Sequence, residues 1–104
     1  MVEIVWKRGA EDDLLRIFAE QEEFQEGAGE RFTRQLDATL QRLRSHPQMA
    51  PIFERPIRRL VVGNLGYGLF YTVEPRGIII HVLVHLSQSP ETIRERVRRS
   101  LGLN

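Results

Sequence analysis

The chain has 104 residues, which is enough for one domain with one modest hydrophobic core and too short for two. It contains no cysteine, which excludes a disulfide framework, a thiolate metal site and a cysteine nucleophile. The N-terminal sequence MVEIVWKRG lacks the apolar core of a secretory signal, and no apolar run approaches the ~20 residues that cross a bilayer. We therefore expect a single soluble domain over residues 1–104, cytoplasmic and without membrane contact.

The net charge of +1 conceals an asymmetry between the two halves of the chain. Residues 1–54 carry 7 Lys/Arg and 11 Asp/Glu. Residues 55–104 carry 8 Lys/Arg and 3 Asp/Glu, so the second half is the basic one. All but one of the 15 basic residues are arginine, the side chain that suits bidentate contacts with phosphate or carboxylate. The second half therefore suits an acidic partner, either a nucleic acid or an acidic protein segment, although a solvated surface also accounts for charge of this size.

The first half of the chain predicts one strand and two helices. Apolar residues alternate over residues 2–6, as in a short strand. Residues 12–24 and 30–45 each carry apolar side chains at helical spacing, and the Gly27-Ala28-Gly29 sequence interrupts them. A helical hairpin is the economical interpretation.

Residues 46–56 contain three prolines and show no apolar period, so they predict a surface connection. Its position between the hairpin and the strands that follow makes Met49, Ile52 and Phe53 candidates to close the edge of the core. An exposed loop that docks a partner is the alternative.

Three strand-like runs follow at residues 57–62, 67–74 and 78–85, rich in β-branched and aromatic side chains. Glycine-containing turns at residues 63–66 and 75–77 separate them. This pattern predicts an antiparallel meander.

Alternation along the last run predicts which face of the sheet is buried. The even positions are all aliphatic and are expected to pack on the helices against Leu36 and Leu40: Ile78, Ile80, Val82 and Val84. The odd positions include His81 and His85, which makes that face the better candidate for a functional or partner-covered surface. On the preceding run we expect the inward side chains to be Leu69, Tyr71 and Val73.

The chain closes with a predicted helix that begins at an N-cap, Ser89, followed by Pro90 at the first helical position. Apolar residues at i, i+4 and i+8 form a stripe that can dock on the domain or on a partner: Ile93, Val97 and Leu101. The other side carries Arg94, Arg96, Arg98 and Arg99. These arginines form either a solvated face or a contact surface for an acidic target.

Few catalytic arrangements fit the sequence. Four residues of strand separate His81 from His85 by ~13 Å, too far to chelate one metal or to flank one scissile phosphate. A P-loop, a paired-histidine helix and a nucleophile elbow are all missing from the sequence. We therefore expect no metal and no cofactor.

The order of these elements, with RRL at residues 58–60, YGLFYTVE at 67–74 and a histidine ending the last strand, resembles the ParE/RelE superfamily of small bacterial toxins. The resemblance covers nearly the whole chain. It implies an α+β fold in which a small antiparallel sheet packs on a helical hairpin, in the order strand, helix, helix, three strands, helix.

Within this superfamily, RelE-like members cleave messenger RNA on the ribosome, whereas ParE-like members poison DNA gyrase by binding. In the RelE case the catalytic residues here would be Arg58, Arg59 and His85. However, Gly68 stands where an arginine is common, and Leu86, Ser87 and Gln88 stand where a basic pair often follows the last strand. These differences from the RelE pattern favour a ParE-like inhibitor without catalytic residues over an endoribonuclease. A non-toxic interaction module of the same fold is the third alternative.

The resemblance also implies partners. A cognate antitoxin, small, partly disordered and DNA-binding, would form a hetero-oligomer with the chain and provide most of its contact with DNA, and DNA gyrase would be the target. The residues expected to bind target or partner are Arg58, Arg59, His81, His85, Ile93, Arg94, Val97 and Arg98.

Overall fold

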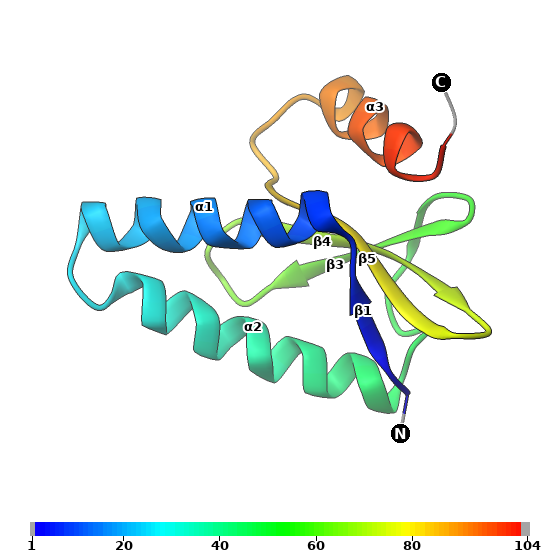
Figure 1. Ribbon diagram of the computed structural model, residues 1–104, viewed down its shortest axis with the longest axis horizontal. Helices are drawn as coiled ribbons and strands as arrows, with labels where there is room; N and C mark the ends of the chain where they lie inside the picture. The colour runs from blue at the N-terminus through cyan, green and yellow to red at the C-terminus, as the bar shows by residue number, and fades with distance from the viewer. Residues whose placement is uncertain (1, 103–104) are drawn as a thin grey trace.

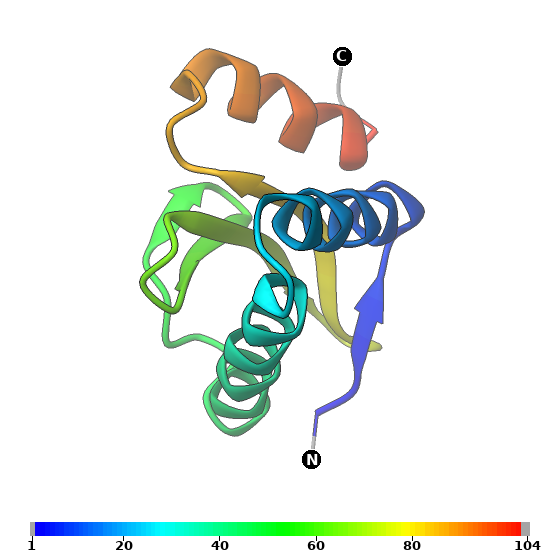
Figure 2. The same cartoon turned by 90° about the vertical axis from the view of Figure 1, so that its left-hand side faces the viewer.

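The computed structural model describes residues 2–102, in which helices cover both faces of one sheet (Figures 1 and 2). The elements in chain order are β1 (Ile4–Trp6), α1 (Arg8–Phe24), α2 (Ala28–Ser45), β2 (Ile52–Glu54), β3 (Ile57–Val62), β4 (Tyr67–Glu74), β5 (Gly77–His85) and α3 (Pro90–Ser100). None of these helices is both long and apolar enough to span a bilayer.

The sheet has the strand order β1-β5-β4-β3-β2, and its meander is antiparallel as predicted. The α+β class is confirmed. Two details differ from the expectation: β1 pairs parallel with β5, which makes the sheet mixed, and β2 adds a fifth strand. With three residues, β2 is too short to show a period in the sequence.

Helices α1 and α2 form the predicted hairpin, and α1 begins four residues earlier than expected. The connection turns at Gly27, whose φ of 86° suits glycine. A Cβ at Gly29 would lie 2.9 Å from the ring of Phe18, so the glycine allows the two helices to approach closely. The Glu22 carboxylate accepts hydrogen bonds from the amides of Gly27 and Gly29 and so caps the start of α2.

Each face of the sheet has its own hydrophobic cluster. Figure 2 shows α2 and α3 on opposite sides of the strands. The cluster on the hairpin side includes Ile17, Phe32, Leu36, Leu40 and Leu43 with Leu69, Tyr71, Ile78, Ile80 and Leu83. The cluster under α3 consists of Ile57, Phe70, Val82, Val84, Ile93 and Val97.

A bulge in β5 determines which of its residues join the hairpin-side cluster and which join the cluster under α3. Tyr71 of β4 pairs with Ile80, but Phe70 pairs with Val82, so His81 is an extra residue on β5. The alternation shifts by one position at the bulge. Ile80 therefore faces the hairpin, whereas Val82 faces α3.

The prediction that all four even positions of β5 meet the hairpin is thus wrong for Val82 and Val84. Both are buried, at 1% exposure each, but they pack under α3. A sequence pattern with period two cannot show such a shift, because β-branched residues continue on both sides of it.

On β4, the burial of Leu69 and Tyr71 is confirmed, and the burial of Val73 is not, since it is 39% exposed. The expectation that Met49 and Ile52 close the core is also wrong: they are 44% and 41% exposed.

Ala50 instead lies in the hairpin-side core, and the Tyr71 hydroxyl donates a 2.8 Å hydrogen bond to the carbonyl of Pro47, which holds the connection in place. Phe53 is partly buried as expected, but against the α3 side, edge-on to Phe70 with 5.0 Å between ring centroids.

Replacing Val82 with Asp tests the assignment of the α3-side core. The substitution buries an unpaired charge, so we expect it to reduce the free energy of unfolding by more than about 3 kcal/mol. Val73→Asp is the matched control, because that side chain is already partly exposed. Chemical denaturation of both variants gives the comparison, and equal stability of the two would contradict the assignment.

Candidate functional site

Helix α3 begins at a capped N-terminus, where Ser89 accepts a hydrogen bond from the amide of Thr92. Its apolar stripe packs on the sheet, with Ile93 and Val97 only 4% and 1% exposed. The stripe therefore docks on the domain itself. A partner could reach these two side chains only if α3 left the sheet.

The arginines of α3 reach two acidic side chains of the body. Glu54 of β2 pairs with Arg94 at 3.7 Å and with Arg98 at 2.6 Å, and Arg94 also lies over the ring of Phe53, 5.7 Å from its centroid. The hydrogen bond to Glu54 raises the pKa of Arg98. Arg94 and Arg98 remain partly exposed and can contact a target from this clamped position.

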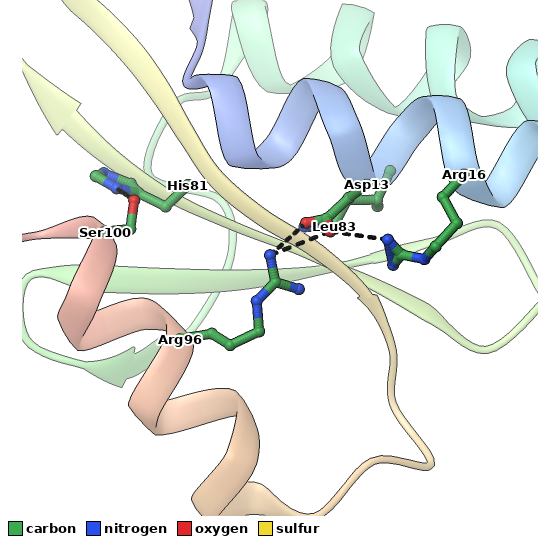
Figure 3. A network of polar contacts seen from close by, with 6 residues as sticks. All are labelled: Asp13, Arg16, His81, Leu83, Arg96 and Ser100. Atoms are coloured by element: carbon green, nitrogen blue, oxygen red, sulfur yellow. Dashed lines mark hydrogen bonds and ion pairs between the residues drawn. The ribbon is translucent and has the colours of Figure 1, made fainter.

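The second acidic side chain, Asp13 of α1, is 3% exposed and lies where three elements meet (Figure 3). It accepts hydrogen bonds from Arg96 of α3 at 2.9 and 3.1 Å and from Arg16 at 3.3 Å. It also accepts a 3.1 Å bond from the amide of Leu83. Because β1 ends at Trp6, the outer edge of β5 has no strand neighbour there, and Asp13 supplies the missing acceptor.

His81 is buried under α3, at 3% exposure, between Thr72 and Ser100. The Thr72 hydroxyl donates to Glu74 at 2.7 Å, so its oxygen accepts from Nε2–H of His81 at 3.0 Å. Nδ1 then accepts from the Ser100 hydroxyl at 2.6 Å. Burial, with the nearby charge of Lys7, lowers the pKa of His81 to about 4, so the ring is neutral at pH 7. We assign it a structural role in seating α3.

His85 lies on the opposite face, because the bulge reverses the alternation between the two histidines. It stacks edge-on against Tyr67, with 5.0 Å between ring centroids, and bonds to Ser87 at 2.7 Å. The expectation of one face carrying both histidines is wrong for this reason. His85 is exposed at the end of β5.

Arg58 and Arg59 also point to opposite faces, as neighbours on a strand do. Arg58 donates to the carbonyls of Ala50 at 2.7 Å and Gln48 at 3.3 Å, so it supports the connection before β2. Arg59 is exposed on the α3 side.

The set that an RNA-cleaving site would need is therefore not assembled. Arg59 lies on one face, and Arg58 and His85 lie on the other, opposite Tyr71 and Tyr67 of β4. Four residues of strand separate these two positions by ~13 Å. A scissile phosphate needs its cations and its acid or base around one point. Within residues 2–102, no group of three or more His, Asp or Glu side chains is arranged to hold a metal ion.

Sequence reasoning missed two contacts that hold α3, the ion pair of Asp13 with Arg96 and the hydrogen bond of His81 with Ser100. One signal was available: Asp13 falls between Ala10 and Ile17 on the buried side of α1, where an acid needs a partner. The identity of that partner, 83 residues away, was not readable from spacing.

Comparison with known families agrees with the fold. The chain matches, over residues 4–90, a family model described as the ParE toxin of the type II toxin-antitoxin system parDE. A search of curated proteins finds no match. The protein belongs to the ParE toxin family, and the family pairs such a toxin with an antitoxin.

Removing the Asp13 carboxylate tests its role at the junction of α1, β5 and α3. Asp13→Ala leaves the buried amide of Leu83 without an acceptor and Arg96 without its ion pair, so we expect a loss of about 3 kcal/mol in unfolding free energy. Asp13→Asn keeps an acceptor for the amide and is expected to lose less. Denaturant titration measures both; a loss below about 1 kcal/mol for Asp13→Ala would contradict the role.

The lowered pKa of His81 predicts an acid-sensitive stability. The unfolded chain binds a proton near the ordinary histidine pKa of 6.5, whereas the folded chain binds it only near 4. This contribution to stability is therefore complete above about pH 7 and is lost as pH falls from 6.5 to 4, by up to about 3 kcal/mol. The difference in unfolding free energy between the parent and His81→Gln, measured across this range, isolates the effect from the carboxylates. A difference that does not change with pH would contradict it.

Proposed function

We propose that the protein is a toxin that inhibits DNA gyrase by binding, without catalysis, and that its cognate antitoxin neutralises it. Membership of the ParE toxin family supports the toxin role. The choice of gyrase rests on the resemblance to ParE-like members, which poison that enzyme.

The observation that carries the proposal is that Arg58, Arg59 and His85 do not lie around one point. Arg58 is engaged with backbone carbonyls, and Arg59 faces the other side of the sheet. Gly68 cannot supply a further cation, and a Cβ there would lie 2.5 Å from the side chain of Leu86. These contacts favour a binding protein over a ribonuclease.

The binding surface that we propose is the exposed side of α3. Four arginines lie on this helix, and Glu54 and Asp13 hold three of them in fixed positions: Arg94, Arg96 and Arg98. Fixed arginines lose less conformational entropy when they meet an acidic partner. The helix thus offers an ordered basic surface to gyrase.

The deciding assay adds purified toxin to a gyrase supercoiling reaction and, separately, to programmed ribosomes. We expect inhibited supercoiling or trapped cleaved DNA in the first reaction and intact messenger in the second. Codon-dependent cleavage without a gyrase effect would establish the ribonuclease instead. No effect in either reaction, with no growth defect on expression, would favour a non-toxic interaction module.

Neutralising two arginines of α3 tests the surface. Arg94→Gln with Arg98→Gln is expected to raise the half-inhibitory concentration by about tenfold, because both charges face the target. Glutamine is preferable to glutamate here, since a new acid would repel Glu54. Arg31→Gln with Arg34→Gln, exposed on α2, removes the same charge elsewhere and is the control. Equal potency of the two double variants would contradict the assignment.

A further inference from the structure

Three side chains that the sequence pattern predicts to be buried are instead exposed together. Met49, Ile52 and Val73 are 44%, 41% and 39% exposed, and they line two adjoining hollows. Isolated exposed apolar residues are common on protein surfaces, but a cluster in a hollow marks a contact site.

The larger hollow has a volume of about 500 Å³ and is lined by His46, Pro47, Gln48, Met49 and Val73. The smaller, of about 240 Å³, shares Gln48 and Val73 and adds Ile52, Arg55, Pro56 and Arg58. We name the two together the α2–β2 groove. It lies where α2 has ended at Ser45 and the hairpin no longer covers the sheet.

The walls of the groove are held by the body of the protein. The Tyr71 hydroxyl bonds to the Pro47 carbonyl at 2.8 Å, and Arg58 bonds to the carbonyls of Gln48 and Ala50. Val73 lies two residues beyond Tyr71 on the same strand and therefore projects past the fixed loop. A partner would meet a preformed surface, which lowers the entropy cost of binding.

Charge indicates what kind of segment fits. The lining residues include two arginines and no acidic side chain. Two acids adjoin lining residues in the sequence, and both have partners: Glu54 pairs with Arg94 and Arg98. Glu74 accepts a hydrogen bond from the Thr72 hydroxyl and pairs with Arg76. By contrast, the exposed apolar side chains of α1, which are Leu15, Phe18 and Phe24, lie on a helix rich in Asp and Glu. An acidic segment would be attracted to the groove and repelled from α1.

We propose that the α2–β2 groove binds a segment of the antitoxin that places apolar side chains against Met49, Ile52 and Val73 and acidic side chains beside Arg55. This inference rests on the proposed neutralisation by a cognate antitoxin and adds the surface through which it occurs. The α3 surface proposed for gyrase lies across the sheet, so the two contacts use different faces.

The test measures binding of the purified antitoxin, the product of the small reading frame adjacent to the toxin gene, by calorimetry. Met49→Glu with Val73→Glu removes apolar contact and adds charge that repels an acidic segment, so we expect the Kd to rise at least about tenfold. Leu15→Glu, at a residue 70% exposed on α1, is the matched control and is expected to change the Kd less than about twofold. Arg55→Glu is expected to weaken binding and to reduce its dependence on salt.

Methionine methyl NMR provides a direct readout. The chain has two methionines, Met1 and Met49, so one methyl signal reports on the groove. We expect the Met49 signal to shift or broaden when antitoxin is added and to remain unchanged when an equal concentration of an unrelated acidic protein is added.

The outcomes separate this inference from the proposed function. If the parent forms no complex with the antitoxin, the proposed neutralisation fails and this inference fails with it. If the parent binds but the double variant binds equally well, only the groove assignment is overturned. If the parent dimerises alone and Met49→Glu makes it monomeric, the occupant is a second copy of the chain, which also overturns the proposal.

Discussion

The carboxylate of Asp13 is the contact on which the arrangement of the other elements depends. It supplies an acceptor to the β5 amide that β1 does not reach, and the same oxygens hold Arg96 of α3. One buried charge therefore fixes the hairpin, the sheet and the C-terminal helix relative to one another. The ion pair satisfies the carboxylate in a place where an unpaired acid would be strongly destabilising.

The bulge at His81 determines how the two faces of the sheet are used. Before it, Ile80 packs under the hairpin; after it, Val82 packs under α3, and the two histidines end on opposite faces. The buried His81 joins the strands to Ser100 of α3, whereas the exposed His85 stacks on Tyr67. The proposed function, inhibition by binding, does not need these groups to converge.

The charge asymmetry of the chain becomes two separate surfaces in the folded protein. Arginines on α3 pair with Glu54 and Asp13 on one side of the sheet, and Arg55 and Arg58 line an apolar groove on the other. Acidic side chains cover much of α1. The folded chain therefore presents two separate basic surfaces, one on each side of the sheet, and the proposed contacts with target and antitoxin use one each.

The sequence by itself determined the hairpin, the meander and the capped last helix, because each rests on local periodicity, turn residues or capping. Only the tertiary structure decided where the apolar stripe of Ile93 and Val97 docks, and which face Val82 joins, since a bulge leaves no mark in a run of β-branched residues. The structure also exposed Val73, because the hairpin ends before it can cover that end of β4. Contacts such as Asp13 with Arg96 join residues 83 apart, and no local pattern encodes a partner at that distance.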